Sequence, residues 1–316
     1  MAKYRTSLPL MKGGTFLSDG GMETSLIFTQ GIDLPQFASF PLLKDAAGRA
    51  ALTRYYENFL AVARNKGLGF VLDTATWRAS RDWGAKLGYD AAALAEANRA
   101  AVELISGLRL KWESPTTPQI LNGVIGPRGD GYKGGSMNWT EAQDFHAFQA
   151  EIFAKTEADM ISAITMNTIG EAAGIALAAK ASAMPCVVAF TVETDGKLVG
   201  GETLQRAIET VDAVTGGSPL YYMINCAHPS HFQTVLDRDA PWLARVQGVR
   251  ANASAKSHAE LDESTALDEG DIADLARRYR ALGGVLPKMR VIGGCCGTDH
   301  HHIAAICEAV MPAKAA

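Results

Sequence analysis

Short apolar segments typical of β-strands alternate along the whole chain with longer segments that have the apolar spacing of helices. The eight predicted strands cover residues 15–18, 69–76, 120–126, 159–166, 186–192, 220–226, 246–252 and 291–294. Nearly continuous apolar strands separated by helices are typical of a parallel sheet that is buried on both faces. Eight such units in 316 residues predict a (β/α)8 TIM barrel. The alternative is an open, doubly wound sheet, in which the first and last strands do not pair.

The segments between these strands carry helical signals. The predicted helices cover residues 52–65, 91–110, 140–156, 171–181, 202–214, 231–236, 271–282 and 299–311. Residues 140–143 have the form of a capping box, and Asp271 stands where an N-cap residue is expected. Residues 25–50 are expected to be irregular. Because no change in composition resembles a linker, we expect residues 1–316 to form one barrel domain.

Composition excludes several classes of protein. Apolar residues make up 47% of the chain, charged residues 20%, and the net charge is -4 with no long basic run, which argues against nucleic-acid and anionic-membrane binding. The longest apolar stretch, 175–190, is interrupted by Lys180 and Pro185, so no membrane-spanning helix is expected. The N-terminus lacks the apolar segment of a signal peptide. Five scattered cysteines fit a cytoplasmic protein with reduced thiols.

Three cysteines lie at the ends of two predicted strands. Cys226 ends the sixth strand, and Cys295 and Cys296 follow the eighth strand between glycines. The carboxyl ends of all barrel strands meet at one rim, where active sites lie. The sixth and eighth strands flank the seventh, so we expect the three thiols to meet, with Asp19 beside them after the first strand. Three protein ligands and one open position are the pattern of a catalytic zinc site.

A site with three thiolates favours one kind of chemistry. Three thiolates on a divalent zinc ion carry a net charge of about -1, and a thiol that binds such an ion loses its proton. The electron-rich site keeps that thiolate nucleophilic, and its natural partner is a cationic methyl donor, a sulfonium or a quaternary ammonium. Activation of water usually uses histidine-rich sites, and no well-spaced histidine or carboxylate ligands are found at the predicted rim.

Three motifs resemble those of the homocysteine S-methyltransferase family. They are Asp19-Gly20-Gly21-Met22 with Thr24, Asn225-Cys226, and Gly293-Gly294-Cys295-Cys296-Gly297-Thr298. The resemblance covers essentially the whole chain and implies a barrel that transfers a methyl group to a thiol. It implies that the zinc ligands are Cys226, Cys295 and Cys296. It also implies that the acceptor is held by Asp19, Gly20 and Gly21, and we add Asn225 to the expected substrate-binding residues.

Two positions depart from the family pattern. Ile164 stands where family members usually have a glutamate that helps to hold the acceptor's amino group, so Glu23 is the expected substitute and Glu193 the second choice. Arg78 stands where the betaine-using branch has a tyrosine, which lowers the expectation of betaine as the donor. A cationic donor could instead contact one of three aromatic side chains, each contributing about 1–2 kcal/mol when well placed. These are Trp77, Tyr132 and Trp139.

Other conspicuous residues have a simpler structural interpretation. Cys186 and Cys307 are expected in the core. The run 299–302, Asp-His-His-His, could form a second metal cluster, but consecutive helical residues point in different directions, which favours a helix cap and a solvated first turn. His228 is interpreted as a loop residue, and the acidic stretch 262–269 as a solvated loop.

The sequence therefore predicts a cytoplasmic zinc-dependent methyltransferase that moves a methyl group from a small sulfonium or ammonium donor to a small thiol, homocysteine in the first instance. One alternative is the same chemistry on a different thiol or on a selenol. The other is a barrel that binds zinc or thiols without turnover. The sequence leaves the donor and the oligomeric state open.

Overall fold

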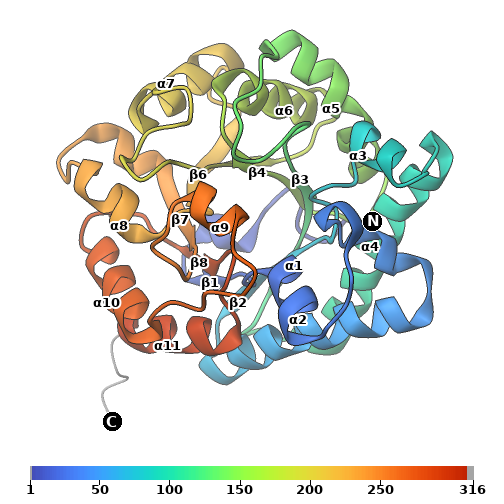
Figure 1. The fold of residues 1–316 in the computed structure, drawn as a ribbon, viewed down its shortest axis with the longest axis horizontal. Coiled ribbons are helices and arrows are strands. Elements are labelled where there is room, and N and C mark those ends of the chain that lie inside the picture. Colours follow the sequence, from blue (N-terminus) through green and yellow to red (C-terminus); the bar gives the residue numbers. More distant parts are fainter. Residues whose placement is uncertain (1, 312–316) are drawn as a thin grey trace.

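The computed structural model describes residues 2–311 and consists of a closed barrel of eight parallel strands surrounded by helices (Figure 1). The strands are β1 (Phe16–Leu17), β2 (Gly69–Asp73), β3 (Gln119–Ile125), β4 (Met160–Met166), β5 (Cys186–Phe190), β6 (Pro219–Asn225), β7 (Val246–Ala251) and β8 (Val291–Gly294). Each strand pairs with its neighbour in the chain, and β1 pairs with β8 through Phe16 with Val291 and Leu17 with Ile292. This pairing confirms the predicted TIM barrel and excludes the open sheet.

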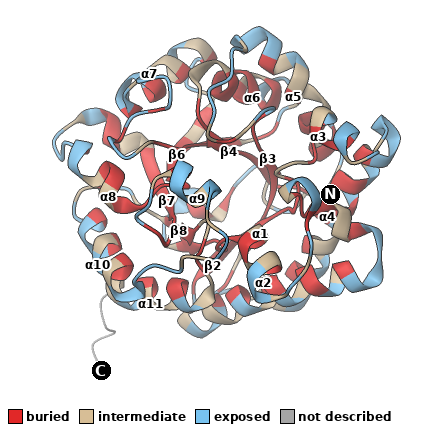
Figure 2. Cartoon of the chain, viewed as in Figure 1, coloured by how far each residue is buried: buried red, intermediate tan, exposed pale blue. Residues whose placement is uncertain are grey.

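The helices lie outside the barrel and in the loops at its ends. The longer ones are α2 (Ala46–Lys66), α4 (Ala91–Trp112), α5 (Trp139–Ala154), α6 (Ile169–Ala181), α7 (Leu204–Thr215), α10 (Ile272–Gly283) and α11 (His300–Val310). The shorter ones are α1 (Met22–Thr24), α3 (Arg81–Lys86), α8 (Pro229–Phe232) and α9 (His258–Asp262). Figure 2 shows the buried residues on the strands and on the helix faces that turn toward them, with exposed residues on the outer faces. None of the described helices is long and apolar enough to cross a membrane.

The barrel has two apolar layers because strand side chains alternate between its interior and its helix-covered outside. Phe16, Val71 and Ile120 belong to the inner cluster, whereas Leu17 and Phe70 pack outward with the helices. The strands are buried on both sides, which explains why they are nearly continuous apolar runs in the sequence.

Helix boundaries and caps agree with the sequence only in part. Asp271 caps α10, as predicted, by accepting hydrogen bonds from the backbone N–H groups of Ala273 and Asp274. The capping box of α5 is formed by Asn138 and Glu141, so the prediction that it starts at Thr140 is wrong. Thr140 carries the same kind of signal, but the chain enters the helix two residues earlier.

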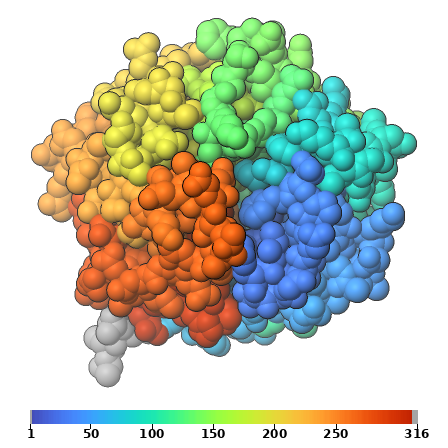
Figure 3. Space-filling model, in the orientation of Figure 1, coloured from blue at the N-terminus to red at the C-terminus, as the bar shows by residue number. Residues whose placement is uncertain are grey.

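The short helices α1, α3 and α9 were not predicted, because three to six residues are too few for a visible apolar period. Two of them lie over the carboxyl end of the barrel. In Figure 3 the orange segment that contains α9 lies against the blue N-terminal segment over the middle of this face. These loops cover the rim on which the predicted site residues stand.

Candidate metal and acceptor site

The three predicted ligand cysteines meet at the carboxyl end of the barrel. Cys226 directly follows β6, and Cys295 and Cys296 directly follow β8. Their sulfur atoms all lie within 4.8 Å of one another, close enough for one metal ion to contact all three. Three thiolates are soft ligands that suit zinc, so the donor set fits the predicted metal. The barrel brings these ligands together across a wide separation in sequence.

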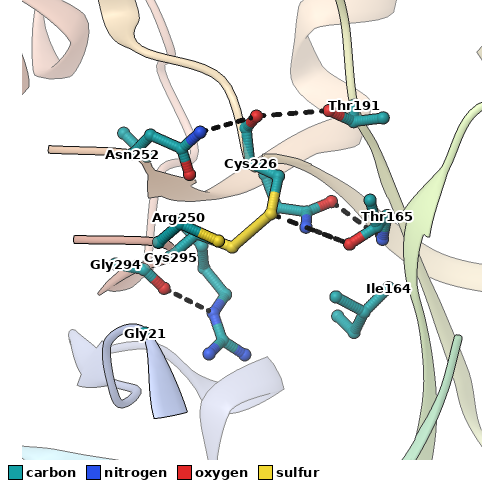
Figure 4. The surroundings of a disulfide bond; sticks show 12 residues. Gly21, Ile164, Thr165, Thr191, Cys226, Arg250, Asn252, Gly294 and Cys295 are labelled. Atoms are coloured by element: carbon teal, nitrogen blue, oxygen red, sulfur yellow. Dashed lines mark hydrogen bonds between the residues drawn. A yellow bond between two sulfur atoms is a disulfide. The ribbon is translucent and has the colours of Figure 1, made fainter. Parts of the chain in front are cut away.

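Cys226 and Cys295, which are separated by 69 positions in sequence, form a disulfide in the structure (Figure 4), with 5.3 Å between their Cα atoms. The expectation that all cysteines are reduced thiols is therefore wrong for this pair. Composition alone predicts reduced thiols in such a chain, but the fold places these two sulfur atoms within bonding distance. The same sulfur atoms can form a disulfide or bind a metal, so a metal site that uses all three cysteines requires this pair to be reduced.

Backbone contacts hold Cys226 in an uncommon conformation. Its φ angle is 53°, in the left-handed region that costs a residue with a side chain on the order of 1 kcal/mol. Its carbonyl oxygen accepts hydrogen bonds from Asn252 Nδ2 at 3.1 Å and Thr191 Oγ1 at 3.4 Å. Its N–H donates to the carbonyl of Arg250 at 3.1 Å. Bonds from two neighbouring strand ends therefore fix the direction in which the Cys226 sulfur points.

Asn225 supports the rim and does not line the cavity. Its side-chain oxygen accepts from the backbone N–H of Thr165 at 3.0 Å, and its Nδ2 donates to Thr165 Oγ1 at 2.9 Å. Thr165 also has a left-handed φ of 63°. The structure therefore places Asn225 between the ends of β6 and β4, apart from the other predicted substrate residues.

Gly20 and Gly21 pack directly against the cysteine loop. A Cβ atom on Gly21 would lie 2.8 Å from the carbonyl oxygen of Cys295, and one on Gly20 would lie 2.5 Å from that of Thr298. Gly21 N–H donates to the Thr298 carbonyl at 3.0 Å. Only glycine fits at these two positions without displacing the loop that carries the cysteines.

The predicted ligands and most predicted substrate residues line one inner cavity. Asp19, Gly20, Gly21 and Glu23 line it together with the three cysteines. Asp73, Trp77, Tyr132, Ile164, Thr165 and Arg250 also line it. An outer cavity, which shares the Trp77, Tyr132 and Cys296 walls with the inner one, is lined by Arg78 and by the carboxylates of Asp130, Asp262 and Asp268. Trp139, the third aromatic candidate, is not among the residues that line these two cavities.

A buried ionic cluster forms one wall of the inner cavity. The Arg250 guanidinium, at the end of β7, forms salt bridges with both Asp19 and Asp73, and its Nε donates to the Gly294 carbonyl at 3.3 Å. Asp19 also accepts from Tyr55 OH at 3.1 Å. Burial raises the pKa of Asp19 to about 7, although Arg250 opposes this shift. Burial disfavours the charge on Arg250, but Asp73 and Asp19 outweigh it and hold the pKa above its usual value.

Sequence reasoning identified Asp19 but missed its partners Arg250, Asp73 and Tyr55. Both Asp73 and Arg250 lie within predicted strands that are otherwise mostly apolar. A charged residue at such a position could have indicated a buried ion pair. Such residues are almost never fully buried unless they are paired.

Glu23 lies in the first turn of α1, where its carboxylate accepts a hydrogen bond from Ser39 Oγ at 2.8 Å. Burial raises its pKa, and the hydrogen bond from Ser39 opposes that shift. Ile164, which replaces the expected glutamate, is buried at the end of β4. The second-choice substitute, Glu193, does not line the inner cavity described here.

Tyr132 lies next to the cysteine sulfurs. Its hydroxyl is 3.6 Å from Cys226 Sγ and 4.0 Å from Cys296 Sγ, and its ring stacks on His258 with 4.1 Å between centroids. The Trp77 ring is already covered on one side by Arg78, with 4.9 Å between guanidinium and ring centroid. Both predicted cage residues therefore border the cavity.

The remaining predictions concern residues outside this site. Cys186 and Cys307 are free and buried, as expected for core cysteines.

Asp299 is the N-cap of α11 and forms a capping box with His302. Asp299, His300 and His301 each place one potential ligand atom within 4.8 Å of the others. The Asp299 carboxylate, however, already accepts hydrogen bonds from the backbone N–H groups of His301 and His302. His302 is buried, so the first turn is solvated only in part. His228 precedes and caps the short helix α8.

Comparison with known proteins gives several similar sequences. Betaine–homocysteine S-methyltransferase 1 of Rattus norvegicus is 26% identical over 200 residues, which cover 55% of this chain and 45% of that protein. The same enzyme of Mus musculus is 28% identical over 187 residues, covering 52% of this chain and 43% of that protein. The matched segment spans less than half the length of these relatives.

Solved structures show the same fold. The metallated and oxidised forms of the homocysteine methyltransferase MmuM from Escherichia coli match with TM-scores of 0.74 and 0.75. Each is 20% identical, and each match covers 96% of this chain and 99% of the other. The family model described as Homocysteine S-methyltransferase matches residues 16–310, nearly the whole chain. The chain therefore belongs to the homocysteine S-methyltransferase family.

Proposed function

We propose that this protein is a zinc-dependent S-methyltransferase that moves a methyl group from a sulfonium or quaternary ammonium donor to a thiol. The observation that carries the proposal is the convergence of Cys226, Cys295 and Cys296, whose sulfur atoms lie within 4.8 Å of one another at the catalytic end of the barrel. Family membership supports the same reaction. Homocysteine is the acceptor to test first, because the family takes its name from it.

In the proposed site the three cysteines would hold zinc as thiolates. Bound there, zinc lowers the pKa of a thiol in its open position, so that the acceptor is a thiolate near neutral pH. In the transfer the acceptor sulfur forms a bond to the methyl carbon. The bond between that carbon and the donor's sulfur or nitrogen breaks, and its electron pair stays on the donor, which becomes neutral at that atom. No general base is required once the thiol proton has left.

The outer cavity supports a cationic donor. It is lined by the carboxylates of Asp130, Asp262 and Asp268 and by the guanidinium of Arg78. Asp268 pairs with Lys256 at 3.1 Å and Asp130 with Lys133 at 3.8 Å, so Asp262 is the carboxylate without a salt bridge among the described residues. Burial and the nearby charge of Asp130 raise the pKa of Asp262, which indicates that this carboxylate lacks sufficient positive charge around it. A positively charged methyl donor would supply it. Because this cavity shares Cys296 with the inner one, a donor there would approach the acceptor sulfur from the solvent side.

Titration of the cobalt-substituted protein with homocysteine tests the proposal. The protein is reduced with a phosphine before cobalt is added, since the Cys226–Cys295 pair must be free. Cobalt bound by three thiolates gives intense thiolate-to-metal absorption, and entry of a thiol strengthens it. The absence of these bands would overturn the metal assignment and the reaction with it. Bands that no thiol or selenol changes, with no methyl transfer from any sulfonium, would favour a barrel that binds metal without turnover.

A further inference from the structure

We propose that Thr165 is a positioning residue for the metal site, and that its hydroxyl donates a hydrogen bond to the Cys226 sulfur when that cysteine is a metal-bound thiolate. Asn225 fixes the direction in which the hydroxyl donates. The inference rests on the proposed function, because it assigns a role at the same three-cysteine site. Three observations carry it: the hydrogen bonds of Asn225, the backbone conformations of Thr165 and Cys226, and the unequal surroundings of the three sulfur atoms.

The hydrogen bonds of Asn225 leave one direction for the hydroxyl proton of Thr165. The backbone N–H of Thr165 can only donate, so the Asn225 atom that it contacts at 3.0 Å must be the side-chain oxygen. The other end of the amide is then the nitrogen, which donates to Thr165 Oγ1 at 2.9 Å. Because the hydroxyl oxygen accepts this bond, its own proton is free to donate to another atom.

The Cys226 sulfur is the acceptor that remains for this proton. Thr165 Oγ1 lies 3.9 Å from Cys226 Sγ, and among residues 2–311 no other acceptor contacts this proton (Figure 4). Thr165, Asn225 and Cys226 are all buried, so the hydroxyl is shielded from bulk water. Sulfur in a disulfide is a weak acceptor, whereas hydrogen bonds to a charged acceptor are about twice as strong as neutral ones. The contact therefore contributes most when Cys226 is a thiolate.

The backbone adopts an uncommon conformation at both residues of this contact. Thr165 has a φ angle of 63°, and Cys226 has one of 53°. A left-handed conformation is especially rare for a β-branched residue such as threonine. Such conformations persist where surrounding contacts hold them, and they are concentrated at functional sites. The fold thus maintains two unfavourable conformations at the residues whose side chains meet, which supports a role for this contact in the site.

The three sulfur atoms have unequal surroundings. Cys226 Sγ contacts two hydroxyls, that of Thr165 and that of Tyr132, the latter at 3.6 Å. Cys296 Sγ contacts the Tyr132 hydroxyl alone, at 4.0 Å. In the part of the chain that the structure describes, Cys295 Sγ contacts no hydroxyl. Hydroxyl donors are therefore concentrated on Cys226.

A hydrogen bond to a metal-bound thiolate has two effects. It orients the sulfur, and it lowers the charge that the sulfur donates to the metal. Lower charge from Cys226 favours a further thiolate in the open position, where the acceptor thiol is expected. Loss of groups that hydrogen-bond to metal ligands typically costs about 10–100-fold in metal affinity or activity. Thr165 would act in this way through Cys226, without contact to either substrate.

Absorption of the reduced, cobalt-substituted protein tests the hydrogen bond. A donor stabilises the sulfur lone pair and raises the energy of the thiolate-to-metal band, so loss of the donor moves the band to longer wavelength. We expect this shift in Thr165→Val, which keeps the shape of the side chain but lacks the hydroxyl, together with zinc binding that is weaker by about tenfold. Thr165→Ser, which keeps the hydroxyl, should have the wild-type wavelength.

Thr191→Val is the matched control. Thr191 is also a buried threonine that donates to Cys226, but to its carbonyl oxygen, at 3.4 Å. Its loss can weaken zinc binding through the backbone, but it should leave the wavelength of the band unchanged. Circular dichroism checks that each variant is folded. If Thr165→Val does not fold, Thr165→Ala and Thr165→Ser provide the same comparison, because alanine also lacks the hydroxyl.

The possible outcomes separate this inference from the proposed function. A shift in Thr165→Val that is absent from Thr165→Ser and from Thr191→Val supports both. If the band keeps its wild-type wavelength in Thr165→Val, or shifts equally in Thr191→Val, the hydrogen bond to sulfur is wrong and the metal site stands. If the wild-type protein shows no thiolate-to-metal bands, the proposed function fails, and the role of Thr165 fails with it.

Discussion

Individual residues at the rim are held in place by contacts from other strands. Cys226 and Thr165 both adopt left-handed backbone conformations at the ends of their strands. The Cys226 carbonyl accepts a hydrogen bond from Asn252 Nδ2, and the Thr165 backbone N–H donates one to Asn225 Oδ1. Backbone strain of this kind persists where surrounding contacts fix it, and it is concentrated at functional sites. The sulfur of Cys226 is therefore positioned before any ligand binds.

Replacement of one cysteine tests the metal site at this scale. We expect Cys296→Ser to weaken zinc binding by at least about tenfold, because only two thiolates remain. Cys307→Ser is the matched control, since Cys307 is buried in α11 outside the site. Zinc content of the reduced proteins, measured by atomic emission after dialysis, gives the comparison. Wild-type zinc content in the Cys296 variant would contradict the assignment.

At the scale of elements, the start of α11 fixes the end of the cysteine loop. The Asp299 carboxylate accepts from the backbone N–H groups of His301 and His302 and lies 2.7 Å from His302 Nδ1, which donates to it when the imidazole is protonated. The same Nδ1 lies 3.2 Å from the Asp299 backbone N. Burial raises the pKa of Asp299, but the hydrogen bonds with His302 outweigh this effect and lower that pKa to about 2. Burial likewise lowers the pKa of His302, but the bond to Asp299 outweighs it and raises that pKa above 6.5.

These shifts predict how the cap depends on pH. The contribution of the Asp299 charge to the free energy of unfolding is complete above the unfolded pKa of 3.8, and it is lost as pH falls through about 2. The contribution of protonated His302 to the free energy of unfolding is complete below pH 6.5, its unfolded pKa. It is lost as pH rises through the higher pKa of the folded protein. We expect Asp299→Ala to lower the free energy of unfolding by about 1 kcal/mol or more at pH 5, and by less at pH 9.

Urea unfolding at the two pH values measures this prediction. Asp299→Asn is the control, because asparagine keeps a capping oxygen and removes only the charge. Its effect should therefore be present at pH 5 and nearly absent at pH 9. An equal loss in both variants at both pH values would show that the ion pair with His302 contributes nothing measurable.

At the scale of the whole molecule, closure of the barrel makes the site. The sulfur ligands come from β6 and β8, Arg250 comes from β7, and Asp19 follows β1, which pairs with β8. A ligand that binds the folded chain alone stabilises it by about 2.7 kcal/mol at a hundred times its Kd. A metal bound by these cysteines would therefore increase the free energy of unfolding.

Removal of metal should accordingly lower the thermal stability of the reduced protein. We expect a higher Tm with zinc than after chelation, measured by scanning calorimetry in a phosphine reductant. Cys296→Ser should lose most of the difference, because its zinc affinity is reduced. The same Tm with and without zinc in the wild-type protein would indicate that the three sulfurs do not bind the metal in the folded chain.

Features that depend on local pattern could be predicted from the sequence. Apolar runs and helical spacing gave all eight strands within a few residues, and the Asn225-Cys226 and Gly293–Thr298 motifs gave the three converging cysteines. Strand periodicity and cysteine placement are properties of short segments, so they can be recognised without knowing which segments meet. Ile164 was likewise located at the rim by its place in a strand.

The pairing of side chains depends on how distant segments meet in the folded chain. Arg250, Asp73, Asp19 and Tyr55 come from four distant segments, and nothing local in the chain marks them as one cluster. The Cys226–Cys295 disulfide and the capping of α5 by Asn138 were also invisible locally. A buried charge is tolerated only beside its partner, and the partner is chosen by closure of the barrel and not by neighbours in sequence. For this reason the sequence located the cysteine cluster, whereas the ionic cluster of Arg250, Asp19 and Asp73 became visible only in the folded protein.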